Sequence, residues 1–192
     1  MSDADLLEQF VSTFEKLDDM TAIRETNPIA WELRVAEPDQ FGWIQWRPQK
    51  VFADAESLAP LYAKLPARFP PLYERFLLSY RWAEVDLGSF RLLANPPGPD
   101  LTRLLAEIEK DKGLSESLVP AGFMQFGKGP DTDYDPVCFD INSRTKLSDY
   151  RIVKIDHEEI LCNYRIKVVA EVAPNFEQLV RQTIERANSA TS

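Results

Sequence analysis

Hydrophobic residues recur three or four positions apart in three stretches of the chain. These stretches are residues 3–20, the segment that follows Pro71, and the segment that follows Pro174. An α-helix turns once every 3.6 residues, so this spacing places the apolar side chains on one face and predicts a helix in each stretch. Proline also suits the first turn of a helix, where its missing N–H is not needed.

Capping residues predict two shorter helices. Asp54 could cap a helix over residues 55–64, and Asp100 could cap another that Gly113 closes. An aspartate side chain accepts hydrogen bonds from the free N–H groups of a first turn, and glycine adopts the left-handed backbone that ends many helices.

Short apolar runs rich in β-branched and aromatic residues predict strands. Three of them form a block, separated by turns, at 121–127, 136–142 and 151–156. Strands are also predicted over 41–46 and 85–93, and the second of these is interrupted at Gly88-Ser89. Because helices and strands are mixed without strict alternation, we expect an α+β fold in a single domain.

The composition narrows the class of protein. A chain of 192 residues that is 44% hydrophobic can bury a core, and no apolar run approaches the ~20 residues needed to cross a bilayer. The 31 acidic residues outnumber the 22 basic ones, for a net charge of −9. Such a chain repels nucleic acid and anionic membranes. If the protein has a macromolecular partner, we therefore expect a basic protein.

The cysteines and the N-terminus point to the cytoplasm. Cys138 and Cys162 have no framework spacing, so we expect two reduced thiols. The first residues are acidic, whereas a signal peptide begins with positive charge and then an apolar run.

Residues 131–158 contain the highest density of acidic residues in the chain and its only histidine. Asp131, Asp133 and Asp135 resemble the start of a calcium loop, but the required glycine and glutamate are absent, so an acidic hairpin turn is predicted. With one histidine in the chain, a multi-histidine metal site is impossible, and we expect His157 to be structural. We predict neither a cofactor nor a metal.

Four short motifs follow one another from Leu65 to the C-terminal helix. They are Leu65-Pro66 with the helix 73–78, the glycine turn 126–129 with 137–140, the strand 153–155 ending in Asp156-His157-Glu158, and the closing segment 172–179. In this order they resemble the SUKH superfamily, the group of cell-wall assembly regulators and immunity proteins. Residues 130–135 interrupt the family's usual Gly-Gly-Asp turn, and residues 1–64 match no part of it.

The resemblance implies a central, bent, mostly antiparallel sheet flanked by helices over residues 65–192. Residues 1–64 would then be a helix-and-strand extension packed on that domain. The resemblance also implies a non-enzymatic, protein-binding module, and the leading hypothesis is a cytoplasmic immunity protein that binds and neutralises a cognate basic toxin. Opposite charge would speed the association.

Exposed acids and one aromatic residue are the candidate contacts with a protein partner. The candidates are Asp131, Asp133, Asp135, Asp140, Asp156 and Trp82. Two alternatives stay open: an intracellular scaffold, or a small-ligand-sensing or hydrolase domain that uses the 127–140 turn and His157. A binding module predicts a broad acidic face, whereas an enzyme predicts a cleft with perturbed titrating groups.

Overall fold

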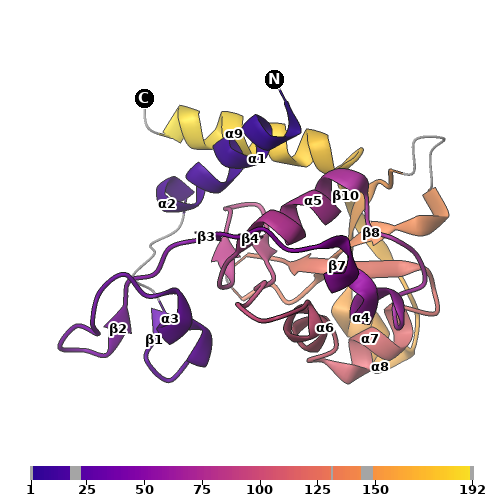
Figure 1. Ribbon diagram of the computed structural model, residues 1–192. Coiled ribbons are helices and arrows are strands. Elements are labelled where there is room, and N and C mark those ends of the chain that lie inside the picture. The colour runs from indigo at the N-terminus through magenta and orange to yellow at the C-terminus, as the bar shows by residue number, and fades with distance from the viewer. Residues whose placement is uncertain (1, 18–22, 131, 144–148, 191–192) are drawn as a thin grey trace.

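The described part of the chain covers residues 2–17, 23–130, 132–143 and 149–190 of a computed structural model (Figure 1). Its N-terminal elements are α1 (Asp3–Ser12), α2 (Phe14–Leu17), β1 (Ile23–Arg24), α3 (Pro28–Leu33), β2 (Trp43–Ile44), β3 (Gln49–Lys50), the 3-10 helix η1 (Ala55–Leu58) and α4 (Ala59–Tyr62). The middle elements are α5 (Pro71–Ser79), β4 (Tyr80–Arg81), β5 (Val85–Asp86), β6 (Arg91–Leu92), α6 (Thr102–Ile108) and α7 (Lys112–Leu118). The last are β7 (Phe123–Lys128), β8 (Pro136–Asp140), the 3-10 helix η2 (Ile141–Ser143), β9 (Ile152–Ile155), α8 (His157–Asn163), β10 (Val168–Ala173) and α9 (Phe176–Ala190).

The largest sheet has six strands in the order β10-β9-β8-β7-β6-β5, and every neighbouring pair is antiparallel. The three-strand block predicted from the sequence is confirmed as β7, β8 and β9. The predicted break at Gly88-Ser89 is the turn between β5 and β6, where Gly88 has φ +78°. The chain thus has the expected single-domain α+β fold with a central antiparallel sheet and flanking helices.

Both faces of this sheet are covered, as Figure 1 shows, with α1, α5 and α9 on one side and α7 and α8 on the other. The strands alternate between the two cores. Phe139 and Ile152 belong to the larger core, whereas Cys138 and Val153 belong to the smaller core with α7 and α8. Successive side chains of a strand point to opposite faces, so the continuous apolar runs of β8 and β9 fit a sheet buried on both sides.

Aromatic rings from α1, α5, α9, β7 and β8 meet in the larger core. Phe10 of α1 packs edge-to-face on Phe76 of α5 and on Phe176 of α9, at 5.4 and 6.3 Å between ring centroids. The buried residues of the predicted extension, 1–64, therefore belong to the same core as the rest of the chain.

Several predicted boundaries were wrong. The helix expected over 3–20 is divided: α1 ends at Ser12, and Thr13, whose N–H and hydroxyl both donate to the carbonyl of Phe10, separates it from α2. Residues 18–20 lie outside the described part of the chain. Gly113 does not close a helix: α6 ends at Ile108, and Gly113 lies inside α7, which Asp111 caps.

The N-terminal half shows similar differences. The predicted helix over 55–64 is η1 followed by α4, and the Asp54 side chain makes no capping hydrogen bond. The predicted strand over 41–46 is limited to β2, which pairs with β1. By contrast, Asp100 does accept a hydrogen bond from the N–H of Thr102 at the start of α6, as expected.

The shared core predicts that a substitution in α1 destabilises the whole domain. Phe10→Ala should lower the free energy of unfolding by about 3–5 kcal/mol, because it leaves a cavity among fully packed rings. Urea unfolding followed by circular dichroism measures this change.

The matched control is Phe41→Ala, since the Phe41 side chain is exposed. It should cost less than about 0.5 kcal/mol. Two separate unfolding transitions in the Phe10→Ala variant would contradict a common core.

Candidate functional site

The acidic turn before β8 is charge-compensated by residues from elsewhere in the chain. The ammonium of Lys154 on β9 lies 2.9 Å from Asp133 Oδ2 and 3.9 Å from Asp135 Oδ2. Asp135 Oδ1 also lies 2.7 Å from Nδ1 of His157. The interpretation of this turn as uncompensated acid is therefore wrong, because β9 and α8 bring basic groups to it. Asp131 lies outside the described residues.

Asp140 and Asp156 are also paired. Asp140 is 1% exposed and lies 2.8 Å from Nη2 of Arg151, so its carboxylate is not on the surface. Asp156 caps α8 by accepting a hydrogen bond from the N–H of Glu159, and the ammonium of Lys167 lies 2.9 Å away. The predicted surface role of Asp140 does not agree with this burial.

Trp82 is not a surface residue either. It is fully buried, its ring stacks on Phe76 at 4.1 Å between centroids, and its indole N–H donates to the carbonyl of Leu93 at 2.9 Å. The local sequence does not reveal this burial, because Trp82 lies directly after Arg81 and two residues before Glu84. Its burial removes it from the candidate contacts.

His157 is the first residue of α8 rather than the last of a strand. Asp135 Oδ1 accepts from its backbone N–H at 2.9 Å and contacts its ring Nδ1, so this carboxylate holds the start of α8 in place. A carboxylate that orients a histidine is also part of a general-base arrangement. Among the described residues, however, no hydroxyl or thiol hydrogen-bonds Nε2 of His157. The pair therefore has a clear structural role and lacks a positioned nucleophile.

The pKa values follow the same pairing. Burial acts to raise the pKa of Asp133, but the hydrogen bonds from Lys154 and from the Asp135 N–H outweigh it and hold that pKa below its ordinary value. The hydrogen bond from Lys167 and that from the Glu159 N–H lower the pKa of Asp156.

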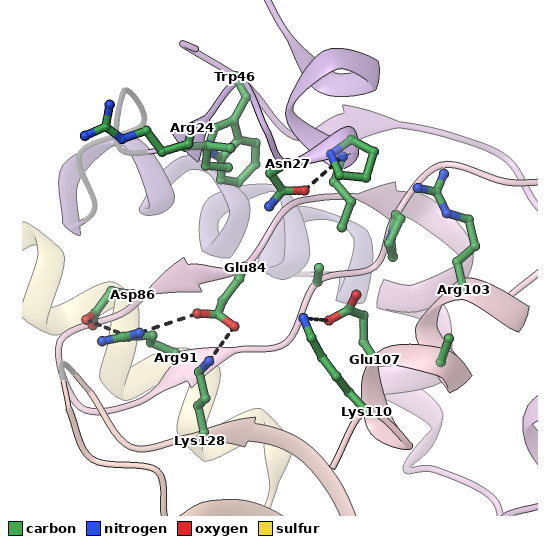
Figure 2. A pocket seen from close by; sticks show the side chains of 16 residues that line it. Arg24, Asn27, Trp46, Glu84, Asp86, Arg91, Arg103, Glu107, Lys110 and Lys128 are labelled. Atoms are coloured by element: carbon green, nitrogen blue, oxygen red, sulfur yellow. Dashed lines mark hydrogen bonds and ion pairs between the residues drawn. The ribbon is translucent and has the colours of Figure 1, made fainter. Parts of the chain in front are cut away.

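A cleft of about 870 Å³ lies between the N-terminal segment and the β5–β6–β7 end of the large sheet, with α6 as a further wall (Figure 2). Figure 2 shows Glu84 between Arg91 and Lys128, at 3.5 and 2.8 Å. Asp86 lies 3.6 Å from Arg91, and Glu107 lies 3.3 Å from Lys110.

The remaining two arginines of the cleft are engaged elsewhere. Arg103 pairs with Glu32 at 2.7 Å. Arg24 points away from the centre of Figure 2; its guanidinium donates to the carbonyl of Phe41 and stacks on the ring of Trp43. The three acids that line this cleft are thus each paired with a base, whereas its five bases leave the lining with an excess of positive charge. The network of pairs ties the edge of the sheet together.

The exposed large apolar side chains of the C-terminal half are Tyr134 and four residues from the end of α8 to the start of β10. We call these four, Leu161, Tyr164, Val168 and Val169, the β10 edge surface. β10 is the outer strand of the sheet and pairs only with β9 among the described strands. The sequence did not predict this surface, because the mostly apolar run Val168–Val172 is typical of any strand and does not show whether the strand is exposed.

Tyr164 has an unusual backbone. It caps α8 in the left-handed conformation, with φ 51° and ψ 37°, and its side chain is 90% exposed. This conformation costs an L-residue other than glycine about 1–2 kcal/mol, and glycine is the usual residue at this position. Neither burial nor packing of the ring offsets that cost.

Acidic residues without an ion pair flank the β10 edge surface. Glu158 on α8 and Glu171 on β10 are exposed and form no ion pair with any residue of the described chain. By contrast, Glu159 is paired with Arg165 at 2.8 Å. The surface therefore combines apolar contacts with a negative margin.

Two comparisons with known proteins found no match for this chain. The chain matches no protein-family model, and no curated protein is significantly similar to it. Within the described residues, no three histidine, cysteine or acidic side chains gather as a metal site would require. None of the helices described is long and apolar enough to span a membrane. Cys138 is buried, Cys162 is exposed, and neither forms a disulfide.

The pairing of Lys154 with Asp133 predicts a pH-dependent contribution to stability. The folded-state pKa of Asp133 is depressed, so the contribution is present above the ordinary pKa of 3.8 and is lost as the pH falls through the lower, folded-state pKa. Lys154→Met should lower the free energy of unfolding at pH 7 by less than about 1 kcal/mol, because both side chains are partly exposed.

Urea unfolding at pH 7 and at pH 3 measures this contribution, and the difference from wild type should shrink at pH 3. Lys64→Met is the control, since Lys64 is exposed and has no ion pair in the described chain. An equal deficit at both pH values would mean that Lys154 acts through packing rather than charge.

Proposed function

We propose that this chain is a non-enzymatic, cytoplasmic protein-binding module: an immunity protein that binds and neutralises a cognate basic toxin through the β10 edge surface. The observation that carries the proposal is Tyr164, which combines an unfavourable backbone with an almost fully exposed ring. Strain that the fold does not need is concentrated at functional sites, because a partner can supply the compensation.

The chemistry around Tyr164 suits a protein partner. Tyrosine is enriched among the residues that dominate binding energies, and Leu161, Val168 and Val169 are further exposed apolar side chains of the same part of the chain. The outer strand β10 also has backbone groups that face away from β9, and an extended segment of a partner can pair with such an edge.

The charge of the surroundings favours a basic partner. The chain carries a net charge of −9, and Glu158 and Glu171 add unpaired negative charge beside the apolar contacts. Complementary charge at the rim speeds encounter and rejects partners of like charge. The resemblance to SUKH domains supports the same role, since many members of that superfamily are immunity proteins.

The two alternative functions would use different parts of the structure. An intracellular scaffold would use the β10 edge surface without protecting a cell from a toxin. A hydrolase or ligand sensor would use His157 and Asp135, and the close contact of those two side chains is the observation that favours it. We place protein binding first because the exposed, strained Tyr164 has no role in either the core or that pair.

Tyr164→Gly should affect stability and binding in opposite directions. Glycine tolerates the left-handed backbone, so the free energy of unfolding should rise by about 1 kcal/mol. Loss of a central aromatic contact should weaken partner binding by roughly 30-fold. Urea unfolding and surface-plasmon resonance measure the two effects, with toxin domains identified among the products of neighbouring genes as the partners to be tested.

Protection of cells that express such a toxin domain distinguishes an immunity protein from a scaffold. Tyr164→Gly should abolish protection, whereas Phe41→Ala, which removes another exposed aromatic ring elsewhere, should preserve it. Full protection by a stable Tyr164→Gly variant would refute the proposed surface.

Steering by charge has its own test. Replacing Glu158 and Glu171 together by glutamine should slow the association rate roughly threefold at low salt, and the effect should fade at high salt because exposed charges are screened. Glu25→Gln with Glu37→Gln removes the same charge from the N-terminal segment and is the control. Equal slowing by both pairs would show that net charge acts without a local surface.

A further inference from the structure

A second, smaller pocket of about 390 Å³ lies between the segment 49–57 and the loop 97–99, and Arg81 lines it. We call it the Arg81 pocket. The segment 51–53 runs along the end of α5, where the N–H groups of Val51 and Ala53 donate to the carbonyls of Ser79 and Leu78. The pocket is therefore built on backbone that the core fixes in place.

Arg81 is a buried cation without a counter-ion. The residue is 3% exposed, and no carboxylate of the described chain lies within ion-pair distance of its guanidinium. Nη1 donates to the backbone carbonyls of Leu77 and Tyr80 at the end of α5. Burying a charge is costly unless hydrogen bonds and an opposite charge compensate it, and here only part of that compensation is present.

The uncompensated part of Arg81 is one edge of the guanidinium. Nε is buried and has no hydrogen-bond partner, and Nη2 makes no hydrogen bond with the described residues. These two nitrogens form the edge that a carboxylate engages in a side-on pair.

Other arginines of this protein use that same edge for carboxylates. Nε and Nη2 both contact an acid in Arg68 with Glu74, Arg151 with Asp140, Arg165 with Glu159, and Arg181 with Glu177. The purely structural explanation, in which Arg81 caps the C-terminal end of α5, accounts for Nη1 alone. Burial also lowers the pKa of the Arg81 guanidinium, as expected where no acid offsets the desolvation.

The other residues of the pocket restrict what can bind there. Asp54 is exposed, makes no capping hydrogen bond, and forms no ion pair with the described residues. The pocket lining thus holds one base and one acid. A ligand with two negative charges is disfavoured by Asp54, whereas a molecule with one anionic and one cationic group matches both.

Phe52 supplies an apolar contact beside these charges. Its side chain is 93% exposed, although Val51 and Ala53 on either side are partly buried. An aromatic ring beside a pocket of 390 Å³ can contact the apolar portion of a small ligand.

We propose that the Arg81 pocket binds a small zwitterion of the amino-acid class. The ligand carboxylate pairs with the Nε–Nη2 edge of Arg81, its ammonium group faces Asp54, and its side chain packs against Phe52. The site is separate from the β10 edge surface, so it goes beyond the proposed toxin binding and can fail or succeed independently of it.

The twenty standard amino acids, tested singly by saturation-transfer NMR and calorimetry against the full chain, are the probes. At least one should bind with a Kd below about 1 mM, the range of a weak metabolite site. Its N-acetyl and carboxamide derivatives should each bind roughly tenfold more weakly, because each lacks one charge. Absence of binding by all twenty, or equal binding by the derivatives, would overturn the proposal.

Variants locate the site. Asp54→Asn and Phe52→Ala change exposed side chains, so both should fold, and each should weaken binding of the amino acid by roughly tenfold. Arg81→Lys keeps the charge but removes the forked edge, and it should abolish binding. If that variant does not fold, the first two still decide the question.

Glu56→Gln is the matched control, since Glu56 is an exposed acid two residues from Asp54 that does not line the pocket. It should bind as wild type does. Wild-type affinity in both Asp54→Asn and Phe52→Ala would place the amino acid elsewhere and refute the assignment.

Discussion

Packing around Phe176 joins the helices to the sheet. Its ring lies 5.0 to 6.3 Å, between centroids, from five other aromatic rings: Phe10, Tyr73, Phe76, Phe126 and Phe139. These rings come from α1, α5, β7 and β8, so one residue of α9 contacts elements that are distant in the sequence. Edge-to-face pairs add about 0.5–1.5 kcal/mol each beyond the burial of their area. The positions of α1, α9 and the sheet therefore depend on a common set of contacts.

The same packing determines where charge is available. Because β9 lies beside β8, Lys154 reaches Asp133 and Arg151 reaches Asp140. Ion pairs of this kind offset most of the negative charge that the segment 131–158 carries in the linear sequence. The net charge of −9 is unchanged, and Glu158 and Glu171 beside β10 are acids that form no ion pair with the described residues. A charge count along the chain thus could not show which acids are paired with bases from other segments.

Two residues depart from what stability alone favours. Tyr164 keeps a left-handed backbone with an exposed ring, and Arg81 keeps a buried guanidinium without an acid. A glycine at the first position and an apolar residue at the second would suit the isolated fold better. Both departures lie at the surface or beside a pocket, where a bound molecule could compensate them. That is why the proposed functions rest on them rather than on the cleft of Figure 2, whose acids are already paired with bases.

The sequence by itself determined the class of the fold and its strongest elements. The spacing of apolar residues is a local property, so it revealed the helices after Pro71 and Pro174 and the strands β7, β8 and β9. It could not determine boundaries such as the end of α1 at Ser12, because the apolar spacing continues through Phe14 and Leu17. Only the tertiary structure decided which candidate contacts are accessible. Trp82 and Asp140 are buried because residues far along the chain pack over them, and Tyr164 is prominent because α8 ends at a sheet edge. Exposure and charge pairing arise from contacts between distant segments, and no local pattern of residues encodes them.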